Sequence, residues 1–375
     1  MTRATQSKVA TDEHWMARAL VLAARAKGQT RPNPPVGSVI LDQNGDKVGE
    51  GYHRKAGSAH AEIAALSRAG DKARGGTLYV TLEPCSTEGR TGACTTAIIA
   101  AGVRRVVVAT RDPNPVHRGR GLRLLRSAGV KVTSGICRQQ ADELIRGFGS
   151  WIASGRPFIT LKLGLTLDGY IADNQGRSKW ITSAQSRRIV QRMRTEADAV
   201  MVGGATARID NPSLLGAQRK AGGPPLLRVI IDDIGAMPPA SQVLCDGCAC
   251  QTIIATTERC APLRRAQYER KGATVWTLRA VKEGVSLKQL MCKLGELGVL
   301  EVLCEGGGEL AASLTRAGLV DRYVLFYAPA ILGGDARPAF GGRRWSLGSM
   351  PSLKIESMTQ VGPDMMVSAL PKGKR

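Results

Sequence analysis

The sequence has few acidic residues and no long apolar run. Its 31 Asp and Glu side chains stand against 53 Lys and Arg, which leaves a formal net charge of +22. No apolar run is long enough to span a bilayer, and the first residues, MTRATQSKVATDEHW, lack the apolar core of a signal peptide. We therefore expect a cytoplasmic protein with no membrane partner.

The excess of positive charge has two interpretations, nucleic-acid binding or a small anionic substrate. The basic residues are scattered, with only small groups at 104–105, 118–126, 187–194 and 372–375. Scattered charge is more often a solvated surface than a binding stripe. We therefore expect a phosphorylated metabolite as the partner and place nucleic acid well behind it.

The length of 375 residues is too great for one ordinary core, so we expect two domains. Strand and helix patterns alternate through the first part, pause at SWIASGRP (150–157) and then resume. This rhythm predicts two α/β domains, 1–151 and 152–375. Strands are predicted at 36–41, 77–82, 103–110, 130–135, 158–163, 198–204, 225–232, 251–256, 299–307, 322–329 and 365–370. Helices are predicted at 61–70, 95–102, 121–129, 182–196, 286–298 and 309–317, with Thr182 opening its helix and Gln185 completing a capping box.

Nine cysteines in a cytoplasmic chain point to metal ligands or core residues rather than disulfides. His60 in HAE, Cys85 after a proline, and Cys94 provide the His/Cys/Cys set of a zinc site with one position open to water. Zinc lowers the pKa of its water, and Glu62 would carry the proton to the leaving amine. The alternative is that the cysteines are small core residues and HAE is an ordinary helix start.

One geometric condition applies to the HAE motif. Side chains at positions i and i+2 of a helix point nearly opposite ways. His60 and Glu62 can therefore serve one water only if they lie at the very start of the helix.

Longer stretches carry a family resemblance. PNPPVG (32–37), GYHRKAGSAHAE (51–62), TLYVTLEPCS (77–86), GRT (89–91) and AAGVRRVVVATRDPNPVHRGRGL (100–122) resemble the deaminase half of the bifunctional deaminase/reductase family of riboflavin biosynthesis. The resemblance implies a cytidine-deaminase-like three-layer α/β/α domain and a substrate that is a diaminopyrimidinone bearing a phosphoribosylamino group. It also implies that Asn33 and His53 hold the base. Without it, Asn33 could be a turn residue and His53 an ordinary surface histidine.

The second half resembles the reductase part of the same family, a dihydrofolate-reductase-like α/β domain that uses NADPH to open the ribosyl ring to a ribityl chain. The resemblance rests on FITLKLGLTLDGYIA, RSKWIT (177–182), VGGAT (202–206), DNP (210–212) and CEGGGELAASL (304–314); the last does not match GxGxxG. It implies Lys162 and Asp210 nearest the chemistry. It implies NADPH contacts from Gly164, Trp180, Thr206, Gly307 and Gly308, and substrate contacts from Ser178, Thr182, Arg194, Asp210, Leu214 and Glu305. Taken singly, DNP could be a turn and Lys162 an edge-strand charge.

The chain departs from that family's pattern at three places. Thr87-Glu88 replaces a usual histidine region, and Glu88 would repel a phosphate. Ala217 stands where an arginine is usual, with Arg219 and Lys220 nearby. Asp233 stands where a small hydroxylated residue is common, and a carboxylate is a poor neighbour for a 2′-phosphate. An alternative is therefore a paralogue with an intact deaminase and an altered reductase, serving a specialised, toxoflavin-like pathway.

Two further expectations remain. The cysteines at 245, 248 and 250 form a CxxC-like loop, but no partner pair follows at zinc-finger spacing, so an accidental cysteine-rich loop is favoured over a metal site. We expect a homo-oligomer. A nucleic-acid deaminase and a catalytically inactive partner protein remain as competing hypotheses.

Overall fold

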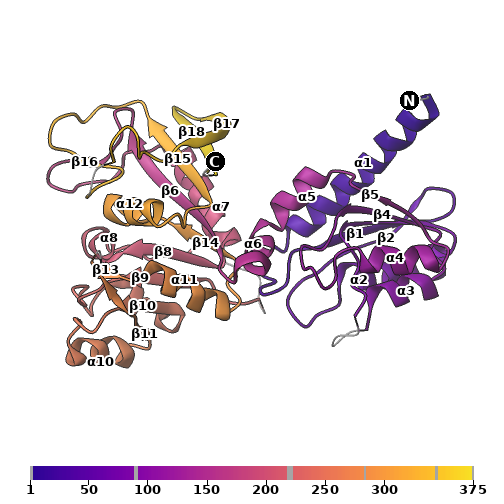
Figure 1. Ribbon diagram of the computed structural model, residues 1–375, viewed down its shortest axis with the longest axis horizontal. Coiled ribbons are helices and arrows are strands. Elements are labelled where there is room, and N and C mark those ends of the chain that lie inside the picture. Colours follow the sequence, from indigo (N-terminus) through magenta and orange to yellow (C-terminus); the bar gives the residue numbers. More distant parts are fainter. Residues whose placement is uncertain (1–2, 88–91, 218–222, 283, 343–344, 374–375) are drawn as a thin grey trace. The chain divides into compact units, whose positions relative to one another are not determined.

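The computed structural model describes residues 3–87, 92–217, 223–282, 284–342 and 345–373 (Figure 1). Its contacts divide the chain into two compact units, one mainly before and one mainly after Gly155. The boundary expected after residue 151 lies inside helix α6 (Arg146–Ser154), which ends where Gly155 takes a left-handed conformation with φ 68°.

The first unit is built on a five-stranded sheet with the order β2-β1-β3-β4-β5. β1 is antiparallel to both of its neighbours, whereas β3, β4 and β5 run parallel. The strands are β1 (Gly37–Leu41), β2 (Lys47–Tyr52), β3 (Thr77–Leu82), β4 (Arg105–Thr110) and β5 (Lys131–Ser134). The helices are α1 (Arg3–Ala24), α2 (Ala61–Ala69), η1 (Gly70–Ala73), α3 (Cys94–Ala100), α4 (Arg120–Ser127), α5 (Arg138–Leu144) and α6.

Side-chain alternation along the central strands divides this unit into three layers. Val106 and Val108 of β4 share one core with α2, α3 and α4. Val107 and Ala109 point to the opposite face and share a second core with α1 and α5. Buried apolar residues on both faces are what a parallel sheet covered by helices requires. The expected three-layer α/β/α arrangement is confirmed, and α2 and α3 lie on the same side of the sheet (Figure 1).

The second unit is built on a nine-stranded sheet with the order β11-β10-β9-β8-β14-β6-β15-β18-β17. The strands from β11 to β15 run parallel, and β18 and β17 follow as an antiparallel hairpin. The strands are β6 (Phe158–Thr166), β8 (Ala199–Gly203), β9 (Leu227–Ile231), β10 (Thr252–Thr256), β11 (Thr274–Thr277), β14 (Glu301–Cys304), β15 (Arg322–Ala328), β17 (Leu353–Val361) and β18 (Asp364–Pro371). Four short strands form two separate pairs, β7 (Tyr170–Ala172) with β16 (Arg337–Pro338) and β12 (Ala280–Val281) with β13 (Gly284–Val285).

Helices of the second unit follow the parallel strands. They are α7 (Ala184–Glu196), α8 (Gly204–Asp210), α9 (Gln242–Cys245), η2 (Ala249–Gln251), α10 (Pro262–Arg270), α11 (Leu287–Glu296) and α12 (Gly308–Arg316). The carboxyl ends of β14, β8, β9 and β10 therefore lie along one edge of the sheet. In open α/β sheets this edge is where ligands bind.

Two expectations about local structure are wrong, and one alternative is excluded. Ser183, not Thr182, caps α7, because its Oγ accepts a hydrogen bond from Ser186 N at 3.2 Å. Its backbone N–H is in turn held by the Asp364 carboxylate at 2.8 Å, a contact that sequence spacing cannot show. The pause expected at 150–157 is helical to Ser154. Lys162 is not at an edge, since β6 lies between β14 and β15.

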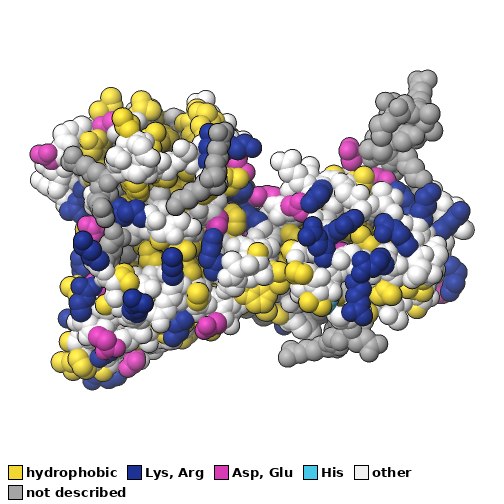
Figure 2. Space-filling model, viewed as in Figure 1, with side chains coloured by type: hydrophobic (Ala, Val, Ile, Leu, Met, Phe, Trp, Pro, Cys, Tyr) yellow, Lys and Arg dark blue, Asp and Glu magenta, His cyan; other side chains and the backbone are white. Residues whose placement is uncertain are grey.

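Among the described residues, no helix is both long and apolar enough to cross a membrane. On the face drawn in Figure 2, Lys and Arg side chains occur on both units rather than in a single stripe.

Candidate functional site

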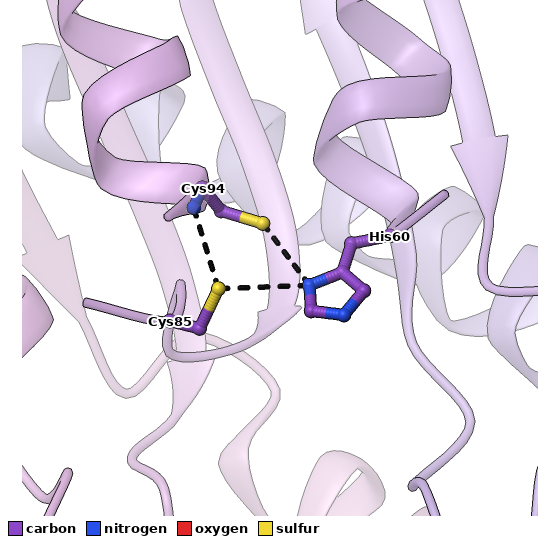
Figure 3. Close-up of side chains that lie close together, drawn as sticks. All are labelled: His60, Cys85 and Cys94. Carbon is purple, nitrogen blue, oxygen red and sulfur yellow. Dashed lines mark hydrogen bonds between the residues drawn. The ribbon is translucent and has the colours of Figure 1, made fainter. Parts of the chain in front are cut away.

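Three potential metal ligands converge in the first unit (Figure 3). His60 immediately precedes α2, Cys94 is the first residue of α3, and Cys85 lies in the loop after β3. His60 Nδ1 lies 3.2 Å from Cys94 Sγ and 3.6 Å from Cys85 Sγ. Cys94 N also donates to Cys85 Sγ at 3.3 Å. The strand and the two helix starts thus bring together residues that are up to 34 positions apart in the chain.

The donor chemistry of this group fits zinc. Its three ligand atoms, one imidazole nitrogen and two sulfurs, lie within 4.8 Å of one another. Three protein ligands leave one tetrahedral position for water or substrate, which is the pattern of a catalytic zinc site. Within the described ranges this is the single group of three or more such side chains found close enough to share an ion.

Glu62 lies beside these ligands in the first turn of α2. Its side chain is only 3% exposed, and burial raises the pKa of its carboxyl group. His60 has an extended conformation, with ψ 162°, and stands just outside the helix. The divergence expected for positions i and i+2 of a helix therefore does not apply, and the condition set by the sequence is met.

Asn33 and His53 are in contact next to the metal ligands. Asn33 Nδ2 lies 3.1 Å from His53 Nε2, and His53 Nδ1 lies 3.2 Å from the carbonyl oxygen of Ala59. His53 is 3% exposed, so it is not a surface histidine, and burial lowers its pKa. A neutral ring satisfies both contacts if Nδ1 donates to the carbonyl and Nε2 accepts from the amide. The His53 ring meets the His60 ring edge-on, with centroids 5.4 Å apart.

Sequence reasoning missed Glu83, a buried carboxylate just before Pro84-Cys85. It accepts hydrogen bonds from the backbone N–H groups of Asp112 at 3.2 Å, Gly119 at 2.9 Å and Gly121 at 3.0 Å. These bonds tie the chain that carries Cys85 to the start of α4. An acidic residue at the end of a fully buried strand is a sequence signal that could have revealed it.

The second unit contains a cleft of about 1090 Å³ at the carboxyl edge of its parallel strands. Most of the residues singled out from the sequence line it, namely Lys162, Gly164, Ser178, Thr206, Asp210, Glu305, Gly307 and Gly308. These residues come from β6, the segment before α7, helix α8, and the stretch from the end of β14 to the start of α12. The fold therefore gathers residues from four separate sequence segments into one cavity.

Buried charges form a small network in this cleft. Arg194 binds Glu305 through two bonds, Nε to Oε1 at 2.5 Å and Nη2 to Oε2 at 3.0 Å. Lys162 Nζ lies 3.8 Å from the same Oε2. Burial lowers the pKa of Lys162, although the Glu305 charge opposes that shift. Burial alone would raise the pKa of Glu305, but the two cations outweigh it and lower it.

Asp210 lines the same cleft and is oriented by Ser178. The Ser178 hydroxyl donates to Asp210 Oδ1 at 3.0 Å, and Lys179 Nζ donates to the backbone carbonyl of Asp210 at 3.0 Å. Asn211 follows with a left-handed φ of 41° at the C-terminus of α8. The DNP segment is thus the C-terminal end of α8, and it places a carboxylate on the cleft wall.

In the glycine-rich segment after β14, neighbouring residues leave no room for a side chain at Gly308 and little at Gly307. A Cβ atom at Gly308 would lie 2.4 Å from the carbonyl oxygen of Pro338, and one at Gly307 would lie 3.1 Å from Thr206 Oγ1. Gly307 is the N-cap of α12, whose first N–H groups have no intrahelical acceptor. A close backbone approach at a helix N-terminus fits the phosphates of a dinucleotide.

Four of the predicted residues do not line the cleft. Trp180 is 71% exposed, with the Arg187 guanidinium 4.5 Å above its ring. The Thr182 methyl group packs at the Cβ position of Gly164, 3.1 Å away. Arg194 reaches the cleft only through Glu305. The Leu214 side chain is 1% exposed within the core, so only its backbone is available to a ligand. Four lining cations, Arg208, Lys288, Arg316 and Arg337, carry no motif and were not predicted.

The departures from the family pattern have different structural settings. Ala217 is exposed, and its N–H donates to Thr195 Oγ1 at 3.1 Å. Asp233 lines the cleft and forms an ion pair with Arg259. The expected effects of Glu88, Arg219 and Lys220 concern positions outside the described residues.

The cysteine-rich loop at 245–250 is organised by an arginine rather than by a metal-ligand group. Arg228 is fully buried and pairs with Asp246, and its Nη2 donates to the carbonyls of Val243 at 2.8 Å and Cys248 at 2.6 Å. In the described part of the chain, the three loop cysteines do not form a group able to share an ion. The interpretation as an accidental cysteine-rich loop stays the simpler one.

Two family models match the chain. The model described as the cytidine and deoxycytidylate deaminase zinc-binding region matches residues 9–110, and the RibD C-terminal domain matches residues 157–367. Among curated relatives, the riboflavin biosynthesis protein RibD of Aquifex aeolicus is 44% identical and that of Escherichia coli 41% identical. The matches cover 95% and 94% of this chain and 97% and 98% of those proteins.

Solved structures agree along the whole length. A RibD structure from Acinetobacter baumannii has a TM-score of 0.86 at 34% identity, with 97% of this chain and 99% of that chain covered. A Thermotoga maritima structure described as a diaminohydroxyphosphoribosylaminopyrimidine deaminase/5-amino-6-(5-phosphoribosylamino)uracil reductase has a TM-score of 0.85 at 32% identity, with 97% and 100% covered.

Proposed function

This chain belongs to the RibD family of riboflavin-biosynthesis deaminase/reductases, and from that premise we propose a role for each group in its two sites. It is a zinc-dependent deaminase fused to an NADPH-dependent reductase. We propose that the first unit replaces the ring amine of a phosphoribosylated diaminopyrimidinone by oxygen. The second unit then reduces the ribosyl group to a ribityl chain.

In the deaminase site, His60, Cys85 and Cys94 would hold zinc, which supplies an activated water. Glu62 would accept a proton from the attacking water and pass it to the departing amine, which would leave as ammonia. Burial keeps Glu62 away from bulk solvent, so the proton is passed within the site. The Asn33 amide and the His53 ring orient the base beside the ligands.

In the reductase site, Gly164, Thr206, Gly307 and Gly308 would hold NADPH, which would supply the hydride. Trp180, outside the cleft lining, would contact it only from the exposed surface. Lys162 and Asp210 lie on the walls of one cleft and control the proton needed when the sugar ring oxygen departs. Because burial lowers the pKa of Lys162, its ammonium gives up a proton more readily than an exposed lysine. Ser178, Thr182, Arg194, Leu214 and Glu305 contact or position the substrate.

The observation that carries the proposal is the convergence of one imidazole nitrogen and two thiol sulfurs beside a buried carboxyl group. The reductase assignment is supported by the placing of Lys162, Asp210 and the glycine-rich turn around one cleft. No observation favours the altered paralogue over the bifunctional enzyme.

A mass-spectrometric time course tests both activities. The zinc-loaded protein receives the diaminopyrimidinone ribosyl phosphate with and without NADPH. We expect deamination in both samples and a further gain of two hydrogens only with NADPH. Deamination that stops there would favour the altered paralogue, and no deamination with zinc bound would exclude the proposed substrate.

We also propose that the chain forms a homo-oligomer through β17. This strand lies at the edge of the nine-stranded sheet, and its residues from Lys354 to Gln360 are all exposed. Ile355 and Met358 are 56% and 60% exposed, which is unusual for apolar side chains on a long edge strand. Light scattering should give at least a dimer, and Met358→Lys should lower the measured mass toward one chain. A monomeric wild type would exclude this proposal.

A cytoplasmic location is proposed as well. The structure leaves all nine cysteines free, as a reducing compartment would. Subcellular fractionation of the producing cells tests it.

A further inference from the structure

We propose that Arg259, held in place by Asp233, recognises the 2′-phosphate that distinguishes NADPH from NADH. The inference rests on the proposed reductase function and adds to it the residue that selects the cofactor. The residues concerned lie at the ends of β9 and β10, whereas Lys162 is on β6, three strands away from β9.

Strand order sets the length of the cleft. Passing across the sheet from β6, the next strands are β14, β8, β9 and β10. Lys162 is on β6, Asp233 lies two residues beyond β9, and Arg259 lies three residues beyond β10. Three strand spacings separate β6 from β9, a span of about 14 Å. A dinucleotide with its reactive ring near Lys162 and its phosphates at the glycine-rich turn would bring its adenosine end to β9 and β10.

Hydrogen bonds fix both residues to the strand ends. The carbonyl oxygen of Asp233 accepts from Thr256 Oγ1 at 3.1 Å and from Thr257 Oγ1 at 2.9 Å. Thr257 Oγ1 in turn accepts from the backbone N–H of Arg259 at 3.2 Å. The Asp233 carboxylate then pairs with the Arg259 guanidinium. The arginine is therefore anchored to the ends of two neighbouring interior strands, β9 and β10.

The ion pair removes the repulsion that Asp233 alone would exert. A carboxylate at the end of this kind of strand favours the 2′-hydroxyl of NADH, whereas a nearby arginine accommodates the 2′-phosphate of NADPH. Here the carboxylate lines the cleft and is neutralised by the arginine. The Arg259 side chain is 51% exposed, so several of its five donors stay open to a phosphate.

Neighbouring groups reinforce the positive character of this end. Lys288, in the first turn of α11, lines the same cleft, as do Gly284 and Ser286. A Cβ atom at Gly284 would lie 3.6 Å from Asp233 Oδ2, so β13 passes close to the pair. The cleft thus reaches Asp233, the ion-pair partner of Arg259, and Lys288 is a further cation on its lining. In this chain the Asp233 carboxylate orients Arg259, and it does not bind the 2′-hydroxyl of a dinucleotide directly.

The test is calorimetric binding of NADP⁺ and NAD⁺ to the full-length protein, with no turnover required. Arg259→Ala should weaken NADP⁺ binding roughly 10- to 100-fold, the usual loss for hydrogen bonds to a charged group, and should change NAD⁺ binding little. The NADP⁺ affinity of Arg259→Lys should lie between those of the wild type and Arg259→Ala, because an ammonium cannot form the two parallel hydrogen bonds of a guanidinium to phosphate. The fragment 2′,5′-ADP should show the same loss as NADP⁺.

Arg265→Ala is the matched control. It removes the same charge from nearby α10, where Arg265 pairs with Glu258 and not with the cleft-lining Asp233. It should leave NADP⁺ binding unchanged. The inference is overturned if Arg259→Ala keeps the wild-type preference for NADP⁺, or if the wild type binds NAD⁺ equally well, in which case the proposed reductase still stands. Failure of the wild type to bind either dinucleotide would overturn the reductase proposal together with this inference.

Discussion

At the scale of single residues, one backbone torsion decides whether the HAE motif can work. With ψ 162°, His60 has an extended backbone and stands just before α2, whereas Glu62 lies in the first turn of the helix. Both side chains can therefore point toward the same place. Glu62 is almost fully buried there without a lysine or arginine among the influences on its pKa. Such a group suits proton transfer better than charge pairing.

Glu62→Gln should abolish proton transfer while keeping the metal site. We expect deamination to slow by about 10²- to 10⁴-fold, since the amide cannot accept the proton. Zinc content, measured by mass spectrometry, should stay at the wild-type value. Glu143→Gln, at an exposed carboxylate on α5, is the control and should leave the rate unchanged. Loss of zinc together with activity would instead assign Glu62 a structural role.

The Arg18–Glu50 pair gives unit 1 a pH-dependent contact between α1 and β2. Arg18 donates to both carboxylate oxygens of Glu50, at 3.0 and 2.7 Å, and these bonds lower the pKa of Glu50 to about 2. A lowered carboxyl pKa stabilises the fold above the ordinary value of 4.5, and this contribution disappears as pH falls through 4.5 toward 2.

Thermal melts of Arg18→Met against wild type should follow that sign. The difference in Tm should be a few °C near neutral pH, because the pair is partly exposed, and should shrink steadily below about pH 4.5. The corresponding change at the exposed pair, Arg138→Met, should have little effect at any pH. A difference that grows on acidification would contradict the assignment.

At the scale of elements, the close approach of β2 to α2 positions the metal ligands. A Cβ atom at Gly51 would lie 2.7 Å from Ala64 Cβ and 2.8 Å from the carbonyl oxygen of Ala61, the residue between His60 and Glu62. The helix can therefore sit where it does only because β2 has a glycine at this position.

Gly51→Ala should push the start of α2 away from β2. We expect lower zinc content and deamination reduced by at least 10-fold, because a displacement of about 1 Å can cost two orders of magnitude in rate. NADP⁺ binding should not change. Gly149→Ala is the control, since a Cβ atom there meets nothing within 4 Å. Normal zinc content in Gly51→Ala would show that β2 adjusts instead.

Strands were predictable from the sequence where nearly every residue of a short segment is apolar and buried. The strand expected at 77–82 is β3 with the same bounds, because five of its six side chains are buried. Helix α1 and strand β17 were not predicted. In α1 the buried Met16, Ala19 and Leu22 are mixed with apolar residues such as Val21, which is 54% exposed, and in β17 seven consecutive residues are exposed, so neither leaves a clear apolar pattern.

At the scale of the whole molecule, the two sites draw on separate parts of the chain. All three metal ligands precede residue 95, and every residue lining the cleft follows residue 161. Zinc removal with a chelator should therefore abolish deamination. It should leave NADPH-dependent reduction of already deaminated substrate unchanged, as followed by NADPH absorbance. Added zinc should restore deamination alone. A parallel loss of both activities would mean that the second unit depends on the metal.

The sequence by itself determined that the chain has two α/β domains and which residues have the chemistry of metal ligands. Both follow from apolar runs and residue types, which are local properties of the chain. It indicated Lys162, Asp210 and Glu305 through resemblance, without their arrangement. Only the tertiary structure decided that Arg194 acts through Glu305, that the Leu214 side chain belongs to the core, and that Arg259 stands beside Asp233. These pairings join segments up to 111 residues apart, and they arise from strand order and packing, which no local pattern encodes.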